Sequence, residues 1–198
     1  MGKTKYLKEV QVLLMKSPLV TYSSIERIVK HQKKIKGYTK LLVHHLLKKG
    51  IMKKLTKGCY TSTNNAALAV LCFQNAYLGL QDALSLHNLW EQETIPVIIT
   101  SQHVRTGIRD CMHSNILIRK LDKKYFFGIA YYQQDSIALP YSDLEKTFID
   151  MIYFKENMNK EVLENFKEKI NKKKIEKYLK KYPLKIRKKA QSLLQSKF

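Results

Sequence analysis

The amino-acid sequence predicts an α+β protein, and three patterns lead to that prediction. Apolar residues recur at helical spacing near both ends of the chain, and strand-like runs separated by turn residues fill the middle. Hydrophobic residues make up 44% of the 198 positions, which is enough for one full core or two small ones. We therefore expect three segments, over residues 1–63, 64–154 and 155–198.

The first segment begins with two predicted helices. Apolar residues recur at helical spacing over 6–14, and this helix should end near Ser17, because Pro18 disfavours the α conformation of the residue before it. The stretch PLVTY that follows is expected to be extended. Ser23 or Ser24 can then cap a second, short helix, since a serine side chain accepts hydrogen bonds from the free N–H groups of a first turn.

A third helix is expected from about Tyr38 to Lys49, followed by Gly50, the residue type most often found just past a helix end. At about 100° per residue, one side carries apolar residues that should pack: Leu42, Val43, Leu46 and Leu47. The other side carries three basic residues within a narrow arc: Lys40, His44 and Lys48. This helix is therefore expected to have one packed face and one basic face.

Two strand-like runs, IMKKL and CYTST, follow this helix and are separated by Thr-Lys-Gly. Gly58 can adopt a positive φ at little cost in a tight hairpin turn. Three helices followed by a hairpin is the order of a winged helix-turn-helix, in which the second helix of the pair lies in the DNA major groove and the hairpin contacts the flanking backbone. The order of elements therefore predicts a DNA-binding domain.

The charge pattern favours the same function. Residues 1–63 hold 15 basic and 2 acidic residues, residues 64–154 hold 7 and 9, and residues 155–198 hold 15 and 5, within a net charge of +21. Such a field attracts polyanions, either nucleic acid or an anionic membrane surface. The expected phosphate contacts surround the third helix and the hairpin: Lys33, Lys34, Lys36, Lys40, Lys48, Lys53, Lys54 and Lys57. Tyr38 and Thr39 are the expected short-range contacts to double-stranded DNA.

The middle segment is predicted to be a mixed α/β domain with a small sheet. LGLQDALSLHNLW has a helical pattern, and PVIIT, SNILIRKL, YFFGIAYY and SIAL are predicted strands. SDLE, at residues 142–145, has the pattern of a capping box that starts a further helix. Apolar residues after residue 155 predict two or three amphipathic helices packed on this domain, whose lysines are either a second nucleic-acid surface or solvated outer faces.

The cysteines and the apolar runs predict a cytoplasmic protein. Cys59, Cys72 and Cys111 cannot all pair within one chain and lack metal-ligand spacing, so we expect neither a disulfide scaffold nor a structural zinc. The longest apolar run, AALAVLCF, is too short to span a bilayer, and the N-terminus lacks the apolar core of a signal peptide. We therefore expect no membrane insertion and no cofactor.

The sequence contains no strong enzyme motif. It lacks a glycine-rich phosphate loop, G-x-S-x-G and H-E-x-x-H, so we expect no catalytic activity. His87 lies in an apolar helical pattern and is expected to be a hydrogen-bonded core residue. One enzymatic alternative is a metal-dependent nuclease built on Asp110 with Asp122, Lys123 and Lys124, although the last three are more simply a polar hairpin turn.

Three stretches of the chain together resemble a known family. They are KKGIMKKLTKGCYTS, YLGLQDALSLHNLWEQETIP and YFFGIAYYQQDSIALPYSDLEKTFIDMIYF, within residues 22–154. Their order and spacing resemble the AbiEi family, the antitoxins and transcriptional regulators of type IV toxin-antitoxin and abortive-infection systems. The sharpest matches are Ala83, Leu84, His87, Gly128, Leu144, Glu145, Lys146, Thr147 and Asp150. Asn88 stands where the family usually has a glycine.

The resemblance implies a two-part protein. Its winged helix would bind inverted repeats upstream of its own operon as an autorepressor, and its second domain would act against a nucleotidyltransferase-like toxin without a stable complex. We expect Glu145 to be a capping-box residue and Lys146 and Asp150 to be partners on the helix surface, all three structural. Two other hypotheses stay open: an RNA-binding protein that uses the basic ends, and a partner-binding module.

Overall fold

The computed structural model describes residues 6–32, 37–92, 94–134 and 137–196. The chain forms two compact units, the first from residues 1–72 and 110–115 and the second from residues 73–109 and 116–198. Helices and two β-sheets are both present, which confirms the predicted α+β class. No helix among the described residues has the length and apolar character needed to cross a membrane.

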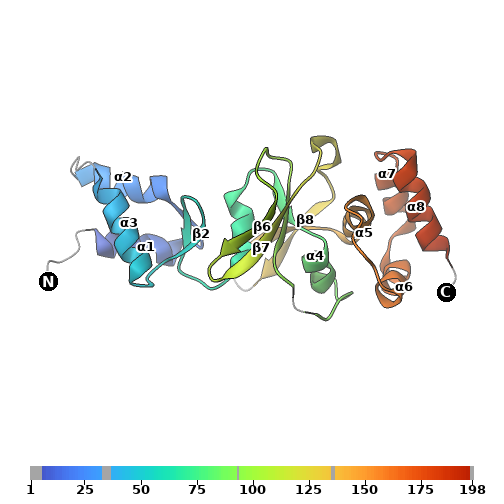
Figure 1. Cartoon of the computed structure of the whole chain (residues 1–198), viewed down its shortest axis with the longest axis horizontal. Coiled ribbons are helices and arrows are strands. Elements are labelled where there is room, and N and C mark those ends of the chain that lie inside the picture. Colours follow the sequence, from blue (N-terminus) through green and yellow to red (C-terminus); the bar gives the residue numbers. More distant parts are fainter. Residues whose placement is uncertain (1–5, 33–36, 93, 135–136, 197–198) are drawn as a thin grey trace. The chain divides into compact units, whose positions relative to one another are not determined.

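The first unit combines helices with a three-stranded sheet (Figure 1). Its elements are α1 (Leu7–Lys16), β1 (Val20–Thr21), α2 (Tyr22–Gln32), α3 (Tyr38–Lys48), β2 (Lys53–Thr56), β3 (Cys59–Thr61) and the 3-10 helix η1 (Ala66–Cys72). The central strand is β3, which is antiparallel to both β1 and β2. The chain thus contains the expected succession of three helices and a hairpin, with the short β1 added to the hairpin.

Local sequence explains where the first two helices begin and end. α1 ends before Ser17, where the backbone becomes extended ahead of Pro18. α2 begins at Tyr22, because Thr21 Oγ1 accepts a hydrogen bond from the Ser24 N–H at 3.2 Å. The residue that caps α2 is therefore Thr21, and the predicted serine caps are wrong.

A small apolar core holds the helices and the sheet of this unit together. It is formed by buried side chains that come mainly from α1, α2 and α3: Tyr6, Val10, Leu14, Val20, Ile25, Val29, Leu42, Val43, Leu46, Met52 and Tyr60. None of them is more than 6% exposed. Since full burial of such a side chain contributes about 1.5–3 kcal/mol, this core fixes the orientation of α3.

The second unit is built on a six-stranded mixed sheet, of which residues 110–115 are assigned to the first unit. Its strands are β4 (Ala76–Leu78), β5 (Val97–Thr100), β6 (Gly107–Cys111), β7 (Ser114–Lys120), β8 (Ile129–Gln134) and β9 (Ile137–Ser142), in the order β6-β7-β5-β4-β9-β8. β5 is parallel to β7 and β4 to β9, whereas the β4-β5 and β8-β9 pairs are antiparallel. The helices are α4 (Gln81–Leu86), the 3-10 helix η2 (Lys123–Tyr125), α5 (Leu144–Tyr153), α6 (Lys160–Lys169), α7 (Lys172–Leu179) and α8 (Leu184–Gln195).

Positive φ angles explain why two of these elements are shorter than predicted. α4 has six residues, because Leu80 and Asn88 on either side of it have φ angles of 55° and 53°. Asparagine tolerates this left-handed conformation better than most residues that have a side chain. The strand predicted at YFFGIAYY starts only at Ile129, since Gly128 has a φ of 69°. β4 and β6 are additional strands; β4 has only three residues, and β6 contains Gly107, Arg109 and Asp110, which do not form an apolar run.

Within the second unit, α5 lies between the sheet and the three C-terminal helices (Figure 1). These helices confirm the prediction of amphipathic helices after residue 155. α6 and α7 each follow an asparagine, Asn159 and Asn171, whose side chain accepts a backbone N–H of the first turn. Buried residues of the sheet and of α4 to α8 form one core, which includes Tyr77, Phe148, Phe166, Tyr182 and Ala190.

Candidate nucleic-acid interface

One side of α3 packs firmly, and its C-terminus is well defined. Leu42, Val43 and Leu46 are buried in the core of the first unit. At the end of the helix, Gly50 has a φ of 67°, and the Ile51 N–H donates to the Leu46 carbonyl at 3.1 Å. This attachment holds the opposite side of α3 in a fixed orientation toward solvent.

That opposite side, which we call the α3 face, consists of Lys40, Leu41, His44 and Lys48. All four residues are exposed, and their spacing places them within an arc of about 100°. Leu41 is 64% exposed at one edge of the arc. A hollow of about 360 Å³ runs along the face, and it is lined by Tyr38, Leu41, Leu42, His44, His45 and Lys48. The α3 face therefore combines three basic side chains with one apolar side chain.

Tyr38 and Thr39, the two residues predicted to make short-range contacts, differ in how far they are buried. Thr39 is 6% exposed and belongs to the packed side of α3, so the prediction that its side chain contacts a partner is wrong. Tyr38 is half-buried, and its ring packs edge-to-face against Tyr6 with the centroids 5.7 Å apart, although it also lines the hollow. Lys33, Lys34 and Lys36 lie outside the described residues.

The β2-β3 hairpin adds further lysines. Its turn depends on Gly58, whose φ of 80° is in the left-handed region that glycine adopts without strain. Lys54 and Lys57 are exposed, whereas Lys53 is half-buried and its Nζ donates to Asn64 Oδ1. The two exposed lysines can therefore contact an anion directly, while Lys53 already has a hydrogen-bond partner.

The second unit contains a buried charged cluster, which includes residues of the AbiEi-like motif. Lys146 and Asp150 have no exposed surface and form an ion pair one helical turn apart on α5. The Tyr77 hydroxyl donates to Asp150 Oδ2 at 2.6 Å, and Lys146 Nζ donates to the Tyr182 hydroxyl at 3.0 Å. The prediction that Lys146 and Asp150 lie on the helix surface is wrong, because the sheet and the C-terminal helices cover α5 on both sides.

Burial dominates the electrostatics of this pair. It lowers the pKa of Lys146 and raises the pKa of Asp150, and the opposite charge of each partner offsets part of that effect. Burial, together with the neighbouring Asp150 carboxylate, also raises the pKa of Tyr77 well above its ordinary value. Lys146 Nζ lies 5.4–5.7 Å from the ring centroids of Tyr77, Phe127 and Tyr182. A pair enclosed in this way satisfies its charges within the core and has no exposed surface for a ligand.

Glu145 also differs from its predicted role. The N-cap of α5 is Asp143, whose Oδ1 accepts the Lys146 N–H at 2.8 Å, so the prediction of Glu145 as a capping-box residue is wrong. Glu145 accepts the Asn171 N–H at 3.0 Å and forms an ion pair with Lys174 at 2.7 Å. Burial opposes ionisation, but Lys174 and the Asn171 N–H outweigh it and lower the pKa of Glu145. Through these two interactions, Glu145 links the N-terminal end of α7 to the N-terminal end of α5.

His87 is hydrogen-bonded as predicted, but it is half-buried and is not a core residue. Its Nε2 lies 2.9 Å from the Ser142 carbonyl oxygen, and its ring packs edge-to-face on Tyr132 at 5.6 Å. Burial lowers the pKa of His87, although the hydrogen bond with Ser142 opposes that shift. The neutral ring therefore joins α4 to the end of β9.

The residues suggested for a metal-dependent nuclease lie at the 3-10 helix η2 and on β6. Asp122 caps η2, where its Oδ1 accepts the Lys124 N–H at 3.3 Å and its Oδ2 lies 3.2 Å from Lys124 Nζ. The prediction of a hairpin turn at residues 122–124 is wrong, because β7 and β8 on either side do not pair. Asp110 is exposed on β6. Within the described part of the chain, no group of three or more His, Cys, Asp or Glu residues could hold a metal ion.

Sequence reasoning missed two kinds of residue at these sites. The first is Leu41. Its position, about 100° from Lys40 around the helix, already indicated that it lies beside the basic residues. The partners of the motif residues are the other kind: Tyr182 contacts Lys146, and Tyr178 donates to Asp143 Oδ2 at 2.8 Å. No local pattern links these tyrosines to α5, because about 35 residues separate each pair.

Comparisons with known proteins identify a similar fold. No family model matches the chain, and no curated protein matches it. Among solved structures, the chain is similar to the Rv2827c protein from Mycobacterium tuberculosis, with a TM-score of 0.65 and 13% sequence identity. The similarity covers 98% of this chain and 77% of that protein. At this level of identity, the similarity shows a shared fold.

Proposed function

We propose that the chain is a DNA-binding transcriptional regulator that acts by occluding a promoter. In this proposal the first unit is a winged helix-turn-helix, α3 is the helix that enters the major groove, and the β2-β3 hairpin contacts flanking phosphates. The observation that carries the proposal is the α3 face, because it is basic, exposed and firmly anchored on its other side.

The side chains of the α3 face suit contacts with DNA. Lysine binds phosphates and guanine edges, histidine can donate or accept at a base edge, and an apolar side chain matches the thymine methyl group. The α3 face supplies all three kinds, and Lys54 and Lys57 add cations for the backbone. Residues 1–63 carry 15 basic and 2 acidic residues, a net charge of +13, which favours binding to a polyanion.

The resemblance to the AbiEi family extends the proposal to the second unit. That unit would act as an antitoxin against a nucleotidyltransferase-like toxin, without a stable complex between the two proteins. Lys146 and Asp150 support this role only by maintaining the fold, since both are buried. Growth of cells that express such a toxin, with and without this chain, tests the role directly, and an absence of rescue would limit the proposal to DNA binding.

The DNA proposal is tested by fluorescence anisotropy on the duplex upstream of the protein's own gene and on a scrambled duplex of equal length, across a salt series. We expect a preference of roughly a thousandfold that persists at physiological salt. Replacing Lys40, His44 and Lys48 with alanine should remove the preference. The matched control replaces three exposed lysines of the C-terminal helices: Lys173, Lys177 and Lys189.

The alternatives give different results in the same assay. Equal, steeply salt-dependent binding to both duplexes would contradict a sequence-specific regulator and indicate a nonspecific polyanion surface. Tighter binding to a structured RNA than to either duplex would favour the RNA-binding alternative. Cleavage that requires a divalent metal and is abolished in the Asp122→Ala variant would favour the nuclease.

A further inference from the structure

A groove of about 530 Å³ lies between helices α6, α7 and α8 of the second unit. All the residues that line it lie within residues 167–195. A volume of this size is typical of pockets that hold a ligand or several side chains of a peptide. The proposed DNA contacts use none of these residues.

The floor of the groove is aliphatic. Ile170, Ile175, Leu179 and Leu194 line it, and they belong to the core of the second unit or pack against it. None of the described lining residues is aromatic. Single-stranded nucleic acids bind largely by stacking bases on aromatic rings, whereas aliphatic floors accept the apolar face of a peptide helix. The floor therefore favours a peptide over a nucleic acid.

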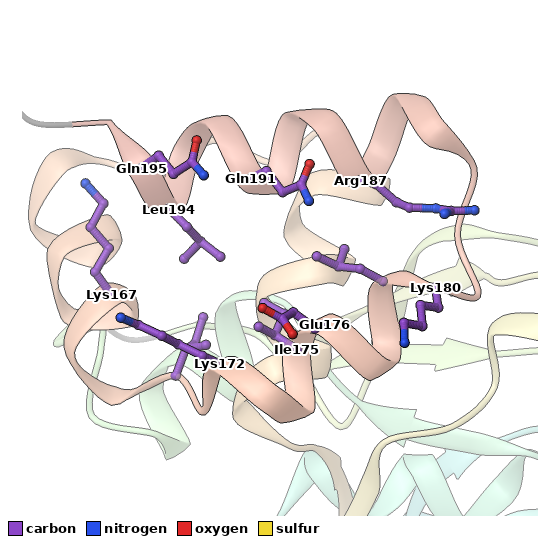
Figure 2. Close-up of a pocket in the computed structure, with 11 residues that line it drawn as sticks. Lys167, Lys172, Ile175, Glu176, Lys180, Arg187, Gln191, Leu194 and Gln195 are labelled. Atoms are coloured by element: carbon purple, nitrogen blue, oxygen red, sulfur yellow. The ribbon is translucent and has the colours of Figure 1, made fainter.

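Positive charge is concentrated at the two ends of the groove. Figure 2 shows one pair of cationic side chains at each end and apolar side chains between them: Lys167 and Lys172, then Ile175 and Leu194, then Lys180 and Arg187. Glu176 is the one acidic residue among the described lining residues.

The four cationic side chains of the groove differ in whether they already donate hydrogen bonds within the protein. Lys172 and Lys180 are exposed and have no acidic partner within the described residues. Arg187 donates through Nε to the Tyr182 carbonyl at 2.7 Å, which holds the guanidinium beside the groove. Lys167 donates to the Ser196 carbonyl. Lys172 and Lys180 are therefore the cations best placed to pair with an incoming carboxylate, one at each end.

We propose that this groove binds an acidic, amphipathic helical segment of a partner protein. Aliphatic side chains of the segment would contact the floor, and carboxylates at its two ends would pair with the cations of the groove. Charge complementarity supports this occupant, since four cations and one acid line the groove. A second copy of this chain is a poor occupant, because two chains of net charge +21 repel each other.

The proposal is tested with the full chain and a fluorescein-labelled designed peptide of about four helical turns, roughly 15 residues. The peptide carries leucines at helical spacings i, i+4 and i+7 and paired glutamates at both ends. A second peptide has serine in place of each leucine, and a third probe is a single-stranded RNA of equal negative charge. Fluorescence anisotropy measures the binding of each probe.

A matched pair of variants locates the binding site. The groove variant combines Lys172→Glu with Lys180→Glu, and the control variant combines Lys173→Glu with Lys177→Glu, exposed residues of the same helix that do not line the groove. We expect the leucine peptide to bind the groove variant about tenfold or more weakly than the unmodified chain, and the control variant within about twofold. The serine peptide should bind the unmodified chain at least about tenfold more weakly than the leucine peptide.

Four results would each overturn the proposal. They are no binding of the leucine peptide, equal binding of the serine and leucine peptides, equal weakening by the two variants, and tighter binding of the RNA than of the leucine peptide. The comparison of the two peptides needs no substitution in the protein, so it stays decisive even where a variant folds poorly.

Discussion

The two units place charged helices in opposite environments. α3 is covered on one side, so it buries a stripe of apolar residues and exposes Lys40, His44 and Lys48. α5 is covered by the sheet on one side and by the C-terminal helices on the other, and every residue from 145 to 152 is buried. The same residue type, lysine, is therefore solvent-exposed on α3 and interior on α5.

The difference shows that a lysine at helical spacing has no fixed role. The number of layers packed against the helix decides whether its charge faces water or requires an internal partner. Lys146 has such a partner in Asp150, because an unpaired charge in this position would cost several kcal/mol. The buried pair thus belongs to the interior of the second unit, whereas the proposed DNA contacts lie on α3.

The largest expected effect comes from breaking the buried pair. Lys146→Met leaves the Asp150 carboxylate buried with the Tyr77 hydroxyl as its remaining donor, and we expect the free energy of unfolding to fall by about 3–5 kcal/mol. The double variant Lys146→Met with Asp150→Leu removes both charges and should cost less than either single change. Urea denaturation followed by circular dichroism measures all three.

Lys40→Met is the matched control for this comparison. Because Lys40 is exposed on α3, its replacement should change the free energy of unfolding by less than about 0.5 kcal/mol. Equal effects of Lys146→Met and Lys40→Met would show that the proposed contrast between the two helices is wrong.

Another acid, Asp82, sharpens the comparison because it is half-buried, its Oδ2 atom is buried without a hydrogen-bond partner, and it has no cationic partner among the described residues. Burial raises the pKa of Asp82 from 3.8 to about 7, although hydrogen bonds from the Val97 backbone and Tyr141 oppose the shift. A carboxyl whose pKa is raised on folding destabilises the native state once the unfolded chain ionises. The cost is absent below about pH 4, grows up to about pH 7 and is constant above it.

Asp82→Asn should therefore stabilise the protein in a pH-dependent way. We expect a gain of up to about 4 kcal/mol in the free energy of unfolding at about pH 8, since each pH unit between 3.8 and about 7 is worth about 1.4 kcal/mol, and almost none at about pH 4. Urea denaturation at the two pH values measures the gain. A gain of the same size at both would contradict the raised pKa.

The sequence predicted the elements of the first unit well, because each depends on nearby residues. Pro18 ends α1, Gly50 ends α3 and Gly58 forms the hairpin turn, and all three effects act within a few residues. The exposed arc of α3 could likewise be found from helical spacing alone. The capping residue Thr21 could not be chosen over its neighbours, since several adjacent side chains offer an oxygen.

The second unit was less predictable, because its structure depends on distant contacts. Lys146 has the spacing of a surface residue in the sequence, and only the packing of Tyr77 and Tyr182 around it shows that it is buried. The strand order β6-β7-β5-β4-β9-β8 and the groove between α6, α7 and α8 likewise join segments that share no local pattern. Tertiary contacts of this kind override local propensity.

Substitutions in the β2-β3 hairpin should also change stability little, and they test binding instead. Lys54→Ala with Lys57→Ala removes two exposed charges, so the free energy of unfolding should change by less than about 0.5 kcal/mol. If both lysines bind phosphates, the slope of log affinity against log salt should fall by up to about 1.8, roughly 0.9 for each phosphate that is no longer neutralised. Anisotropy across a salt series measures the slope.

Lys53→Ala tests whether the slope depends on direct phosphate contacts or only on the net charge of the hairpin. Its Nζ already donates to Asn64, so it should lower the slope less than either Lys54→Ala or Lys57→Ala, although each variant removes one positive charge. Equal effects of the three would mean that only the net charge of the unit matters. An unchanged slope in the Lys54 and Lys57 double variant would remove the hairpin from the proposed interface and leave the α3 face as its sole support, because Lys40, His44 and Lys48 are exposed there.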